Sequence, residues 1–283
     1  MHNKKEIQSV LIKYGAPESL VWLNDKIAKL TESKSSKDLF MAYSLLNVKY
    51  DATKPVSFEN DGNKSSNYFK THNANLVQVA RIYLLSAVLE HDMEFYTPKV
   101  ANIIQVADTG ELETFLKYLV LLPNPEAYKQ TAVEALRTNI ATIFDAISLN
   151  NPYPAAYFND QQWNQMYLKA AFMERDLSQI ESVDERANED LTRIISDYAH
   201  ERWAATRKID PLFWRPVTKF LNKELLKDMD RLLKSDDRKE NMAGALCCFY
   251  SENDTAIELL NKYPELKHDI RTNKISWNTL KNL

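Results

Sequence analysis

Apolar residues recur along most of the chain at the three- and four-residue spacing of an amphipathic helix, in segments of roughly 12–22 residues. No segment alternates apolar and polar residues for long, and no Asn-Gly hairpin signal is present. The pattern therefore predicts an all-α protein with no sheet. Its helices are expected near residues 5–13, 17–31, 36–47, 75–89, 92–107, 110–121, 125–149, 160–173, 186–208, 210–220, 222–234, 237–250 and 253–262.

Prolines and short polar side chains mark several of the predicted helix starts. Pro17, Pro125 and Pro211 lie where a first helical turn tolerates the missing N–H of proline. Asp108 and Asn159 precede two further predicted helices, where such a side chain can accept a hydrogen bond from a free backbone N–H. We therefore expect Asp108 and Asn159 to be N-caps.

The order of the helices predicts the domain organisation. Residues 48–74 are polar and aperiodic, so we expect the N-terminal part, 1–74, to consist of a few helices and a long mobile loop. Over residues 75–283 the helices follow one another with short connections, as in antiparallel pairs. Because they are too many and too short for a four-helix bundle, we predict a curved array of such pairs, an α–α superhelix of the HEAT type, in one continuous domain.

The amino-acid composition argues against one large class of enzymes. Only 4 of the 283 residues are glycine, well below the usual fraction of about 7%. Phosphate-binding loops and the turns of doubly wound sheets require glycine, and neither G-x-G-x-x-G nor G-x-x-x-x-G-K-[ST] occurs. A nucleotide-binding α/β enzyme is therefore disfavoured, and we predict no cofactor.

Charge, apolar runs and cysteine usage bear on partners and location. The 36 basic and 39 acidic side chains give a net charge of −3, which offers no attraction to nucleic acid. The uncharged apolar runs are far shorter than the roughly 20 residues that cross a bilayer, and the first residues lack the apolar core of a secretory signal. Cys247 and Cys248 are neighbours and form no disulfide framework, which suits a reducing compartment. We predict a soluble, cytoplasmic protein with no nucleic-acid partner and no direct membrane insertion.

The segment "SDYAHERWAATR", residues 196–207, carries the most conspicuous functional groups. His200-Glu201 begins like the zinc motif H-E-x-x-H, but Ala204 stands where the second histidine would be. The other histidines have no ligand spacing to one another, so no metal site is predicted. Two interpretations stay open: His200 faces solvent beside Asp197, or His200 and Glu201 line a concave surface as a base or as ligand-binding groups.

The same helix contains an arginine in an unusual position. At 100° per residue, Arg202 points into the apolar stripe of the helix, while His200 lies on the opposite face. A buried guanidinium needs carboxylate or carbonyl partners. We expect Arg202 either to tie its helix to neighbouring helices or to bind an anion in an internal cleft.

Two further helices place polar groups among apolar ones. Asn164 falls between apolar residues of the 160–173 helix, so its buried amide must be hydrogen-bonded. The preceding segment "SLNNPYPAAYF" is biased toward extended backbone by its prolines and offers carbonyl groups, so we expect Asn164 to hold it. In the 125–149 helix, Arg137 and Asn139 border the core stripe on opposite sides, which suits interhelical hydrogen bonds or a polar-lined pocket. No Ser/His/Asp or Cys/His constellation is present in a supporting context.

Four segments of the chain follow one another in a characteristic order: "EALRTNIATIFDAISLNNPYPAAYFNDQQWNQMYLKAAF", "DERANEDL", "DYAHERWAATR" and "FWRPV". Through these segments the chain resembles the EboA family of metabolite-traffic proteins, most specifically over about residues 105–220. Members of that family often have glycine before the arginine at position 207, where this chain has Thr206 at a predicted helix end. The motif positions are Arg137, Thr138, Asn139, Asn151, Pro152, Tyr153, Pro154, Trp163, Asn164, Gln165, Met166, Tyr198, His200, Glu201, Arg202 and Trp203.

The resemblance implies an association with gene clusters that move natural-product precursors toward the cell envelope, alongside membrane prenyltransferase-like and metal-hydrolase-like proteins. It assigns no catalytic residues. What the resemblance implies is therefore a place in metabolite traffic rather than a particular reaction.

Three hypotheses follow. The favoured one is a non-catalytic binding or adaptor protein for the traffic or export of a natural-product precursor. It would hold a small metabolite, or proteins of the same export pathway, in a cleft between the helices 125–149, 160–173 and 186–208. An alternative is a tailoring enzyme in which His200 is the general base and Arg137 or Arg202 stabilises an anion; the other is a pure scaffold. The first predicts these ligand-binding residues: Arg137, Asn139, Tyr153, Asn164, His200, Glu201, Arg202 and Trp203.

Overall fold

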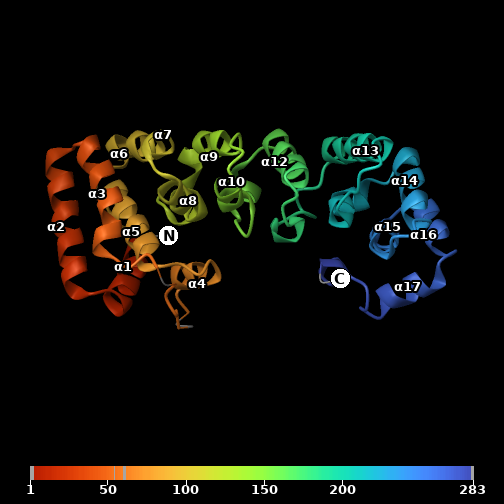
Figure 1. Ribbon diagram of the computed structural model, residues 1–283, viewed down its shortest axis with the longest axis horizontal. Coiled ribbons are helices and arrows are strands. Elements are labelled where there is room, and N and C mark those ends of the chain that lie inside the picture. The colour runs from red at the N-terminus through yellow and green to blue at the C-terminus, as the bar shows by residue number, and fades with distance from the viewer. Residues whose placement is uncertain (1–2, 54, 60–61, 282–283) are drawn as a thin grey trace. The chain divides into compact units, whose positions relative to one another are not determined.

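The computed structural model describes residues 3–53, 55–59 and 62–281 of the chain (Figure 1). Within these ranges every regular element is a helix, and extended backbone is paired only in an isolated antiparallel bridge between Pro55 and Asn75. The prediction of an all-α protein is therefore confirmed, whereas the HEAT-type superhelix stays a prediction. Contacts between residues divide the chain into two compact units, Met1–Ile147 and Ser148–Leu283. The predicted organisation into residues 1–74 and 75–283 of one continuous domain also stays a prediction.

The first unit is built around α5 (Leu76–His91), which is buried on nearly all sides. Helices α1, α2, α3, α6 and α8 pack against it, and Figure 1 shows α5 behind α3 in this unit. A helix that is apolar all round must be surrounded by other elements to be stable in water. The helices of this unit are α1 (Asn3–Tyr14), α2 (Pro17–Ser33), α3 (Ser36–Lys49), α4 (Lys64–Thr71), α5, α6 (Met93–Ala101), α7 (Ile103–Val106), α8 (Thr109–Lys117), η1 (Leu119–Leu121), η2 (Pro125–Tyr128), α9 (Lys129–Ala135) and α10 (Ala141–Ser148), the last of which ends one residue beyond it.

One arginine lies within this apolar environment. Arg81 of α5 is 4% exposed, and its Nη2 atom lies 3.2 Å from Oδ1 of Asn47 and 3.5 Å from Oε1 of Glu111. Because an unpaired buried guanidinium would be costly, these contacts are a condition for placing α5 against α3 and α8. The same Glu111 also completes the capping box of Asp108 at the start of α8, so the predicted N-cap at Asp108 is confirmed.

The second unit is built around α15 (Arg238–Tyr250), whose residues Met242 to Cys248 are all buried. Helices η4, α14, α16, α17 and α18 pack against it. In this unit Asn159 accepts a hydrogen bond from the N–H of Gln162, which confirms the second predicted N-cap. The helices are α11 (Tyr153–Tyr157), α12 (Asp160–Phe172), η3 (Leu177–Gln179), α13 (Glu189–Ala204), η4 (Pro211–Phe220), α14 (Lys223–Leu233), α15, α16 (Asp254–Leu260), α17 (Pro264–Arg271) and α18 (Trp277–Lys281).

The long predicted loop 48–74 contains a helix that the sequence pattern did not indicate. Helix α4 occupies Lys64–Thr71 and buries Phe69 completely, while residues 54, 60 and 61 lie outside the described residues. The helix is short and mostly polar, so only Phe69 and the cap at Asn63 could have indicated it. Helices α17 and α18 were missed for the same reason of length.

The predicted continuous helix 125–149 is wrong, because the chain leaves helical geometry between α9 and α10. The Oγ1 atom of Thr138 accepts a hydrogen bond from the N–H of Ile140 at 3.1 Å. Threonine side chains compete in this way with the intrahelical bonds of the backbone. As a result Ile140, expected in the core stripe, is 52% exposed. The R-T-N motif therefore forms the break between two helices.

The predicted α-helix 210–220 is instead the 3₁₀ helix η4, which is ten residues long. Runs of 3₁₀ helix beyond three or four residues are uncommon. Pro216 lies inside η4, where it has no N–H for an α-helical bond. Pro211 does begin the element, as expected for a proline in a first turn.

Candidate functional site

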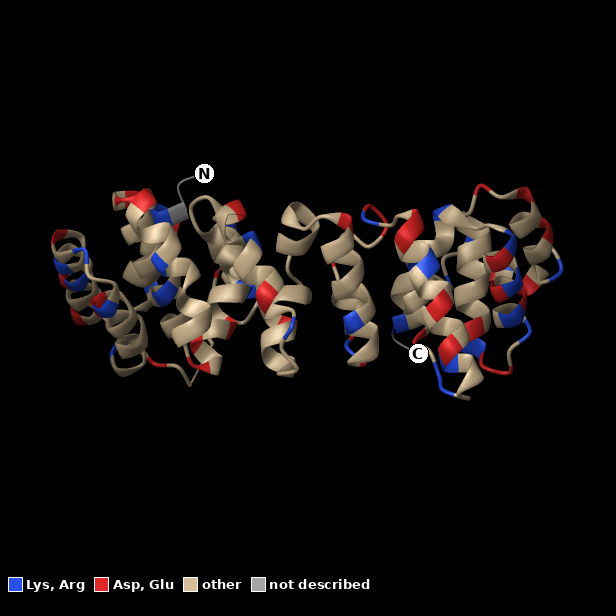
Figure 2. Ribbon diagram, turned by 90° about the horizontal axis from the view of Figure 1, so that it is seen from above, with Lys and Arg blue, Asp and Glu red and all other residues tan. Residues whose placement is uncertain are grey.

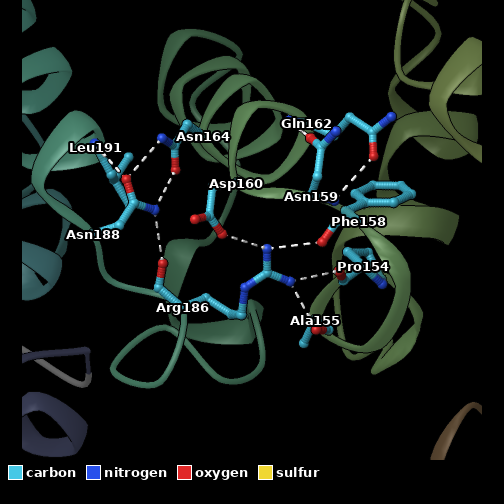
Figure 3. Close-up of polar contacts among 10 residues, drawn as sticks. All are labelled: Pro154, Ala155, Phe158, Asn159, Asp160, Gln162, Asn164, Arg186, Asn188 and Leu191. Atoms are coloured by element: carbon cyan, nitrogen blue, oxygen red, sulfur yellow. Dashed lines mark hydrogen bonds and ion pairs between the residues drawn. The ribbon is translucent and has the colours of Figure 1, made fainter.

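The start of α13 is held by an arginine that bonds to the end of another helix (Figure 3). The guanidinium of Arg186 donates hydrogen bonds to the carbonyl oxygens of Ala155 at 2.7 Å and Phe158 at 2.9 Å, and a longer one to Pro154 at 3.2 Å. It also lies 3.2 Å from Oδ1 of Asp160. The carbonyls of Ala155 and Phe158 lie at the end of α11, where the last turn has no intrahelical donors, whereas that of Pro154 also accepts a hydrogen bond from the N–H of Phe158. Arg186 therefore supplies the donors that α11 lacks.

A pair of asparagines lies beside this arginine and joins two helices. The Nδ2 atom of Asn164 donates to Oδ1 of Asn188 at 3.0 Å, and the Nδ2 atom of Asn188 donates back to Oδ1 of Asn164 at 2.9 Å. Asn188 is the N-cap of α13 and accepts a hydrogen bond from the N–H of Leu191. Figure 3 shows both amides facing each other between α12 and α13. The pair therefore fixes where α13 begins relative to α12.

Asn164 is buried as predicted, but its predicted partner is wrong. The expectation was that Asn164 would bond to the backbone of the segment that precedes its helix. In the structure Arg186 bonds to that backbone, because only the longer side chain with its planar set of donors can reach several carbonyls at once. Arg186 stands in the "DERANEDL" segment, which carries the resemblance described above.

The middle of α13 faces a buried carboxylate on α14. Asp228 is 4% exposed, and its Oδ2 atom accepts a hydrogen bond from the hydroxyl of Ser196 at 2.9 Å. Its Oδ1 atom lies 2.7 Å from Nε2 of His200, whose side chain is 45% exposed. The neighbour expected for His200 was Asp197; that carboxylate instead lies 3.6 Å from Arg193. His200 thus satisfies a buried carboxylate on one side and reaches solvent on the other.

This arrangement has the residue types of a catalytic triad but a different connectivity. In a serine-nucleophile triad the serine bonds to the histidine, which bonds in turn to the carboxylate. Here Ser196 and His200 both bond to Asp228, so His200 is not placed to take the hydroxyl proton of Ser196. What the geometry supports is an oriented imidazole beside a buried carboxylate.

The face of α13 that packs inward differs from the predicted apolar stripe. The buried residues are Leu191, Thr192, Ile195, Ser196 and Ala199. Small side chains on this face let η4 pack closely against α13, which apolarity alone did not indicate.

The prediction that Arg202 is buried in the apolar stripe is wrong, because α13 ends at Ala204 and places Arg202 in its last turn. The Nε and Nη2 atoms of Arg202 donate to the carbonyl of Lys208 at 3.1 and 2.7 Å. A carbonyl was one of the partners expected for Arg202. The carbonyl that it binds belongs to the segment directly after α13 and not to a neighbouring helix. A cleft of about 270 Å³ lies beside Arg202, lined also by Tyr198 and Arg175.

Thr206 ends α13 in a conformation that favours glycine. Its φ of 53° is left-handed, and the N–H of Arg207 returns to the carbonyl of Arg202 at 2.9 Å. A β-branched residue is strained there, because its Cβ lies close to the backbone.

A wide cleft opens at the C-terminal end of α13. It has a volume of about 560 Å³ and is lined by Trp203, Arg207 and Lys208 together with Arg231 and residues that follow α14. The indole of Trp203 stacks on that of Trp214 in η4, with 5.4 Å between ring centroids. The guanidinium of Arg231 lies 4.1 Å from the centre of the Trp203 ring. Trp203 is thus held between a buried indole and a cation.

The cations of this cleft are only partly neutralised. Four basic residues and two acidic ones, Asp236 and Glu240, line it. Lys234 pairs with Asp230 at 2.6 Å. Arg207, Lys208 and Arg231, by contrast, form no ion pair with any described residue. Figure 2 shows basic and acidic residues interspersed within each unit, so this cluster is a local feature of the α13–α14 end.

The predicted ligand-binding residues fall into different environments. Tyr153 and Asn164 are buried within the second unit, whereas Glu201 is exposed on α13. Arg137 and Asn139 are exposed and lie in the break between α9 and α10, in the first unit. The structure brings His200 and Trp203 together, with 5.7 Å between their rings. The cleft predicted between the three helix regions would involve both units and stays a prediction.

Sequence reasoning missed Arg186, Asn188, Asp228 and Arg231. Arg186 and Asn188 lie in an acidic segment just before a helical pattern, and Asn188 is a residue type that favours the N-cap. The start of a helix could therefore have been predicted at Asn188. Asp228 could have been noticed because it falls on the apolar face of a strongly amphipathic helix, between Leu225 and Leu232. Nothing in the sequence pairs Arg231 with Trp203.

No described helix is both long and apolar enough to cross a membrane. Across residues 3–53, 55–59 and 62–281, no group of three or more His, Cys, Asp or Glu side chains could hold a metal ion.

The part of the chain that the structure describes is all-helical, and its Ser196, His200 and Asp228 do not form a serine-nucleophile triad. Residues 3–218 match the family described as "Metabolite traffic protein EboA", and the chain belongs to this family. The match extends further toward the N-terminus than the motifs indicated, and it includes all of α13. Neither the curated proteins nor the solved structures contain a match to the chain.

Replacing Arg186 is expected to destabilise the second unit strongly. Arg186→Ala removes the donors of the Ala155 and Phe158 carbonyls, and a cost of about 3 kcal/mol in the free energy of unfolding follows from the lost charge-assisted bonds and the unsatisfied carbonyls. Arg193→Ala is the matched control on α13; because Arg193 is exposed and its contacts are long, its loss should change stability by less than about 0.5 kcal/mol. Urea unfolding measures both, and equal effects of the two variants would contradict the role of Arg186.

Replacing Thr206 by glycine is expected to stabilise the protein by about 1 kcal/mol. The left-handed conformation costs a side chain roughly 1–2 kcal/mol, and the greater freedom of unfolded glycine offsets part of the gain. Thr206→Ala keeps the Cβ and should leave the melting temperature nearly unchanged. Thermal unfolding followed by circular dichroism measures the difference, and a lower melting temperature for Thr206→Gly would disprove the strain.

Proposed function

We propose that this protein is a non-catalytic adaptor of metabolite traffic, which binds an acidic segment of a partner protein at the α13–α14 end of its second unit. The observation that carries the proposal is the guanidinium of Arg231 over the ring of Trp203, with no carboxylate partner among the described residues. The family to which the chain belongs is named for metabolite traffic, which suits an adaptor role.

The residue types at this surface support a protein partner. Trp and Arg are enriched among the residues that contribute most to protein–protein binding, because each offers a large contact area and a directed polar group. Trp203 is already held rigidly on Trp214, so little side-chain entropy would be lost when a partner covers it. An open cleft of about 560 Å³ suits an extended segment that lies across it.

The charges of the surface support an acidic partner. Arg207, Lys208 and Arg231 are free to meet carboxylates, and an arginine can hold a carboxylate with two parallel hydrogen bonds. The carboxylates of Asp236 and Glu240 lie at the same cleft, so its four basic residues leave it with a modest net positive charge. A segment that combines acidic residues with an apolar residue for Trp203 fits best.

One observation favours a second candidate function, a tailoring enzyme with His200 as general base. A buried Asp228 orients the imidazole, and the other ring nitrogen is available at the surface. One predicted anion-stabilising group is less favourable, because Arg202 bonds to a backbone carbonyl. A metabolite consumed by the wild type and not by a folded His200→Asn variant would establish this candidate.

The adaptor proposal predicts salt-dependent binding of an acidic peptide. A fluorescein-labelled hexaglutamate peptide should bind to the wild type, and Arg231→Ala should weaken it about fivefold, which corresponds to roughly 1 kcal/mol. Arg231→Lys keeps the charge but not the planar group, so it should restore only part of the affinity. Fluorescence anisotropy at two salt concentrations measures these effects, and higher salt should weaken binding by screening.

The control for this experiment is Arg193→Ala, which removes the same charge from an exposed position on α13 where Arg193 already faces Asp190 and Asp197. It should bind the peptide as the wild type does. Hexalysine serves as the control for charge and should not bind. If hexaglutamate bound equally to the wild type and to Arg231→Ala, or not at all, the proposal would be wrong.

A further inference from the structure

A further cleft of the second unit combines aromatic and charged side chains. It has a volume of about 500 Å³, within the range typical of small-molecule sites. Its lining comes from η4, from the end of α15, from the start of α18 and from the segment before α13. Tyr250, Trp277 and Pro216 supply apolar surface, while Asp184, Arg215 and Lys219 supply charge.

The aromatic rings of this cleft are available to a ligand. Tyr250 is 50% exposed, and its only ring contact among the described residues is with the adjacent Phe249. Trp277 is partly buried, and no described aromatic ring packs on it. Aromatic side chains offer a large apolar contact area, with a geometry that suits stacking on a flat group. The rings would accept a flat apolar group.

The charges of the cleft leave one cation without a counter-ion. Asp184 holds Arg215 through two hydrogen bonds, from Nε at 2.8 Å and from Nη2 at 2.6 Å. The Nζ atom of Lys219 has only the backbone carbonyl of Asp184, at 3.3 Å, as a partner among the described residues. The pair Arg215–Asp184 is neutral overall, so Lys219 gives the cleft a charge of about +1. A ligand with one acidic group would complete it.

We propose that this cleft binds a small molecule that combines a flat apolar body with a single acidic group, such as a carboxylate, sulfonate or phosphate. The flat body lies against Trp277 and Tyr250, and the acidic group meets Lys219 and the remaining N–H groups of Arg215. Asp184 keeps the guanidinium in position and repels ligands of higher negative charge. The site is separate from the acidic-partner surface, since the two clefts share no lining residue.

The proposal is tested with two dyes that differ in one acidic group. 1-Anilinonaphthalene-8-sulfonate has a flat apolar body and a sulfonate, and N-phenyl-1-naphthylamine has the same body without the charge. Both become more fluorescent in an apolar environment, so each can be titrated against the folded full chain. We expect the charged dye to bind at one site, at least threefold more tightly than the neutral one because of Lys219.

Four variants assign the binding to this cleft. Trp277→Ala and Tyr250→Ala should each weaken the charged dye by at least about fivefold, since each removes a stacking surface. Tyr250→Ala guards against failure of Trp277→Ala to fold, because Tyr250 is half exposed. Lys219→Gln should weaken the charged dye about threefold and leave the neutral dye unchanged. Phe172→Ala removes an aromatic ring that is 72% exposed on α12, and it should bind both dyes as the wild type does.

The result that would overturn the proposal is equally specific. If Tyr250→Ala and a folded Trp277→Ala bound the charged dye with wild-type affinity, the dye would lie elsewhere. Equal weakening of both dyes by Lys219→Gln would show that the ammonium does not recognise the acidic group. Binding that fell as strongly in Phe172→Ala as in Tyr250→Ala would mean that exposed rings attract the dye without a site.

Discussion

The arrangement of the second unit depends on one interaction, the hydrogen bonding of Arg186 to the carbonyl groups that end α11. A helix end without donors is costly in a packed interior, and the guanidinium satisfies several acceptors from one side chain. Two residues later, Asn188 begins α13 and is held by Asn164 of α12. The position of α13 therefore follows from contacts made before its first turn.

Along α13 the side chains change from buried ones that stabilise the fold to more exposed ones near its C-terminal end. The first turns contribute the buried Leu191 and Ile195 to the core. The middle satisfies the buried Asp228, which leaves little of Ser196 free for chemistry. Only at the end of the helix do an indole and several unpaired cations reach the surface together. Because buried charges must be paired whereas exposed ones need not be, the unpaired cations lie at this exposed end of the helix.

The sequence predicted the helical class and most helix positions, because amphipathic spacing and N-caps such as Asp108 and Asn159 are local signals. It could not predict contacts between distant segments. Asn164 was correctly expected to be buried, yet its partner Asn188 lies 24 residues away and no local pattern indicates it. Arg202 was misplaced because the predicted helix continued to residue 208, so that residues beyond its true end at Ala204 were counted in the apolar stripe. Helix ends thus limit what periodicity can predict about a site.

The 3₁₀ geometry of η4 explains how one short segment can serve two surfaces and the core. With three residues per turn, successive side chains point about 120° apart. Phe213 accordingly stacks on Tyr167 in the interior, with 5.6 Å between ring centroids. Trp214 supports Trp203 at one cleft, and Arg215 binds Asp184 at the other. In an α-helix successive side chains point about 100° apart, so a given direction recurs only after three or four residues. Pro216, which cannot continue an α-helical ladder, therefore helps to keep "FWRPV" in the geometry on which both clefts depend.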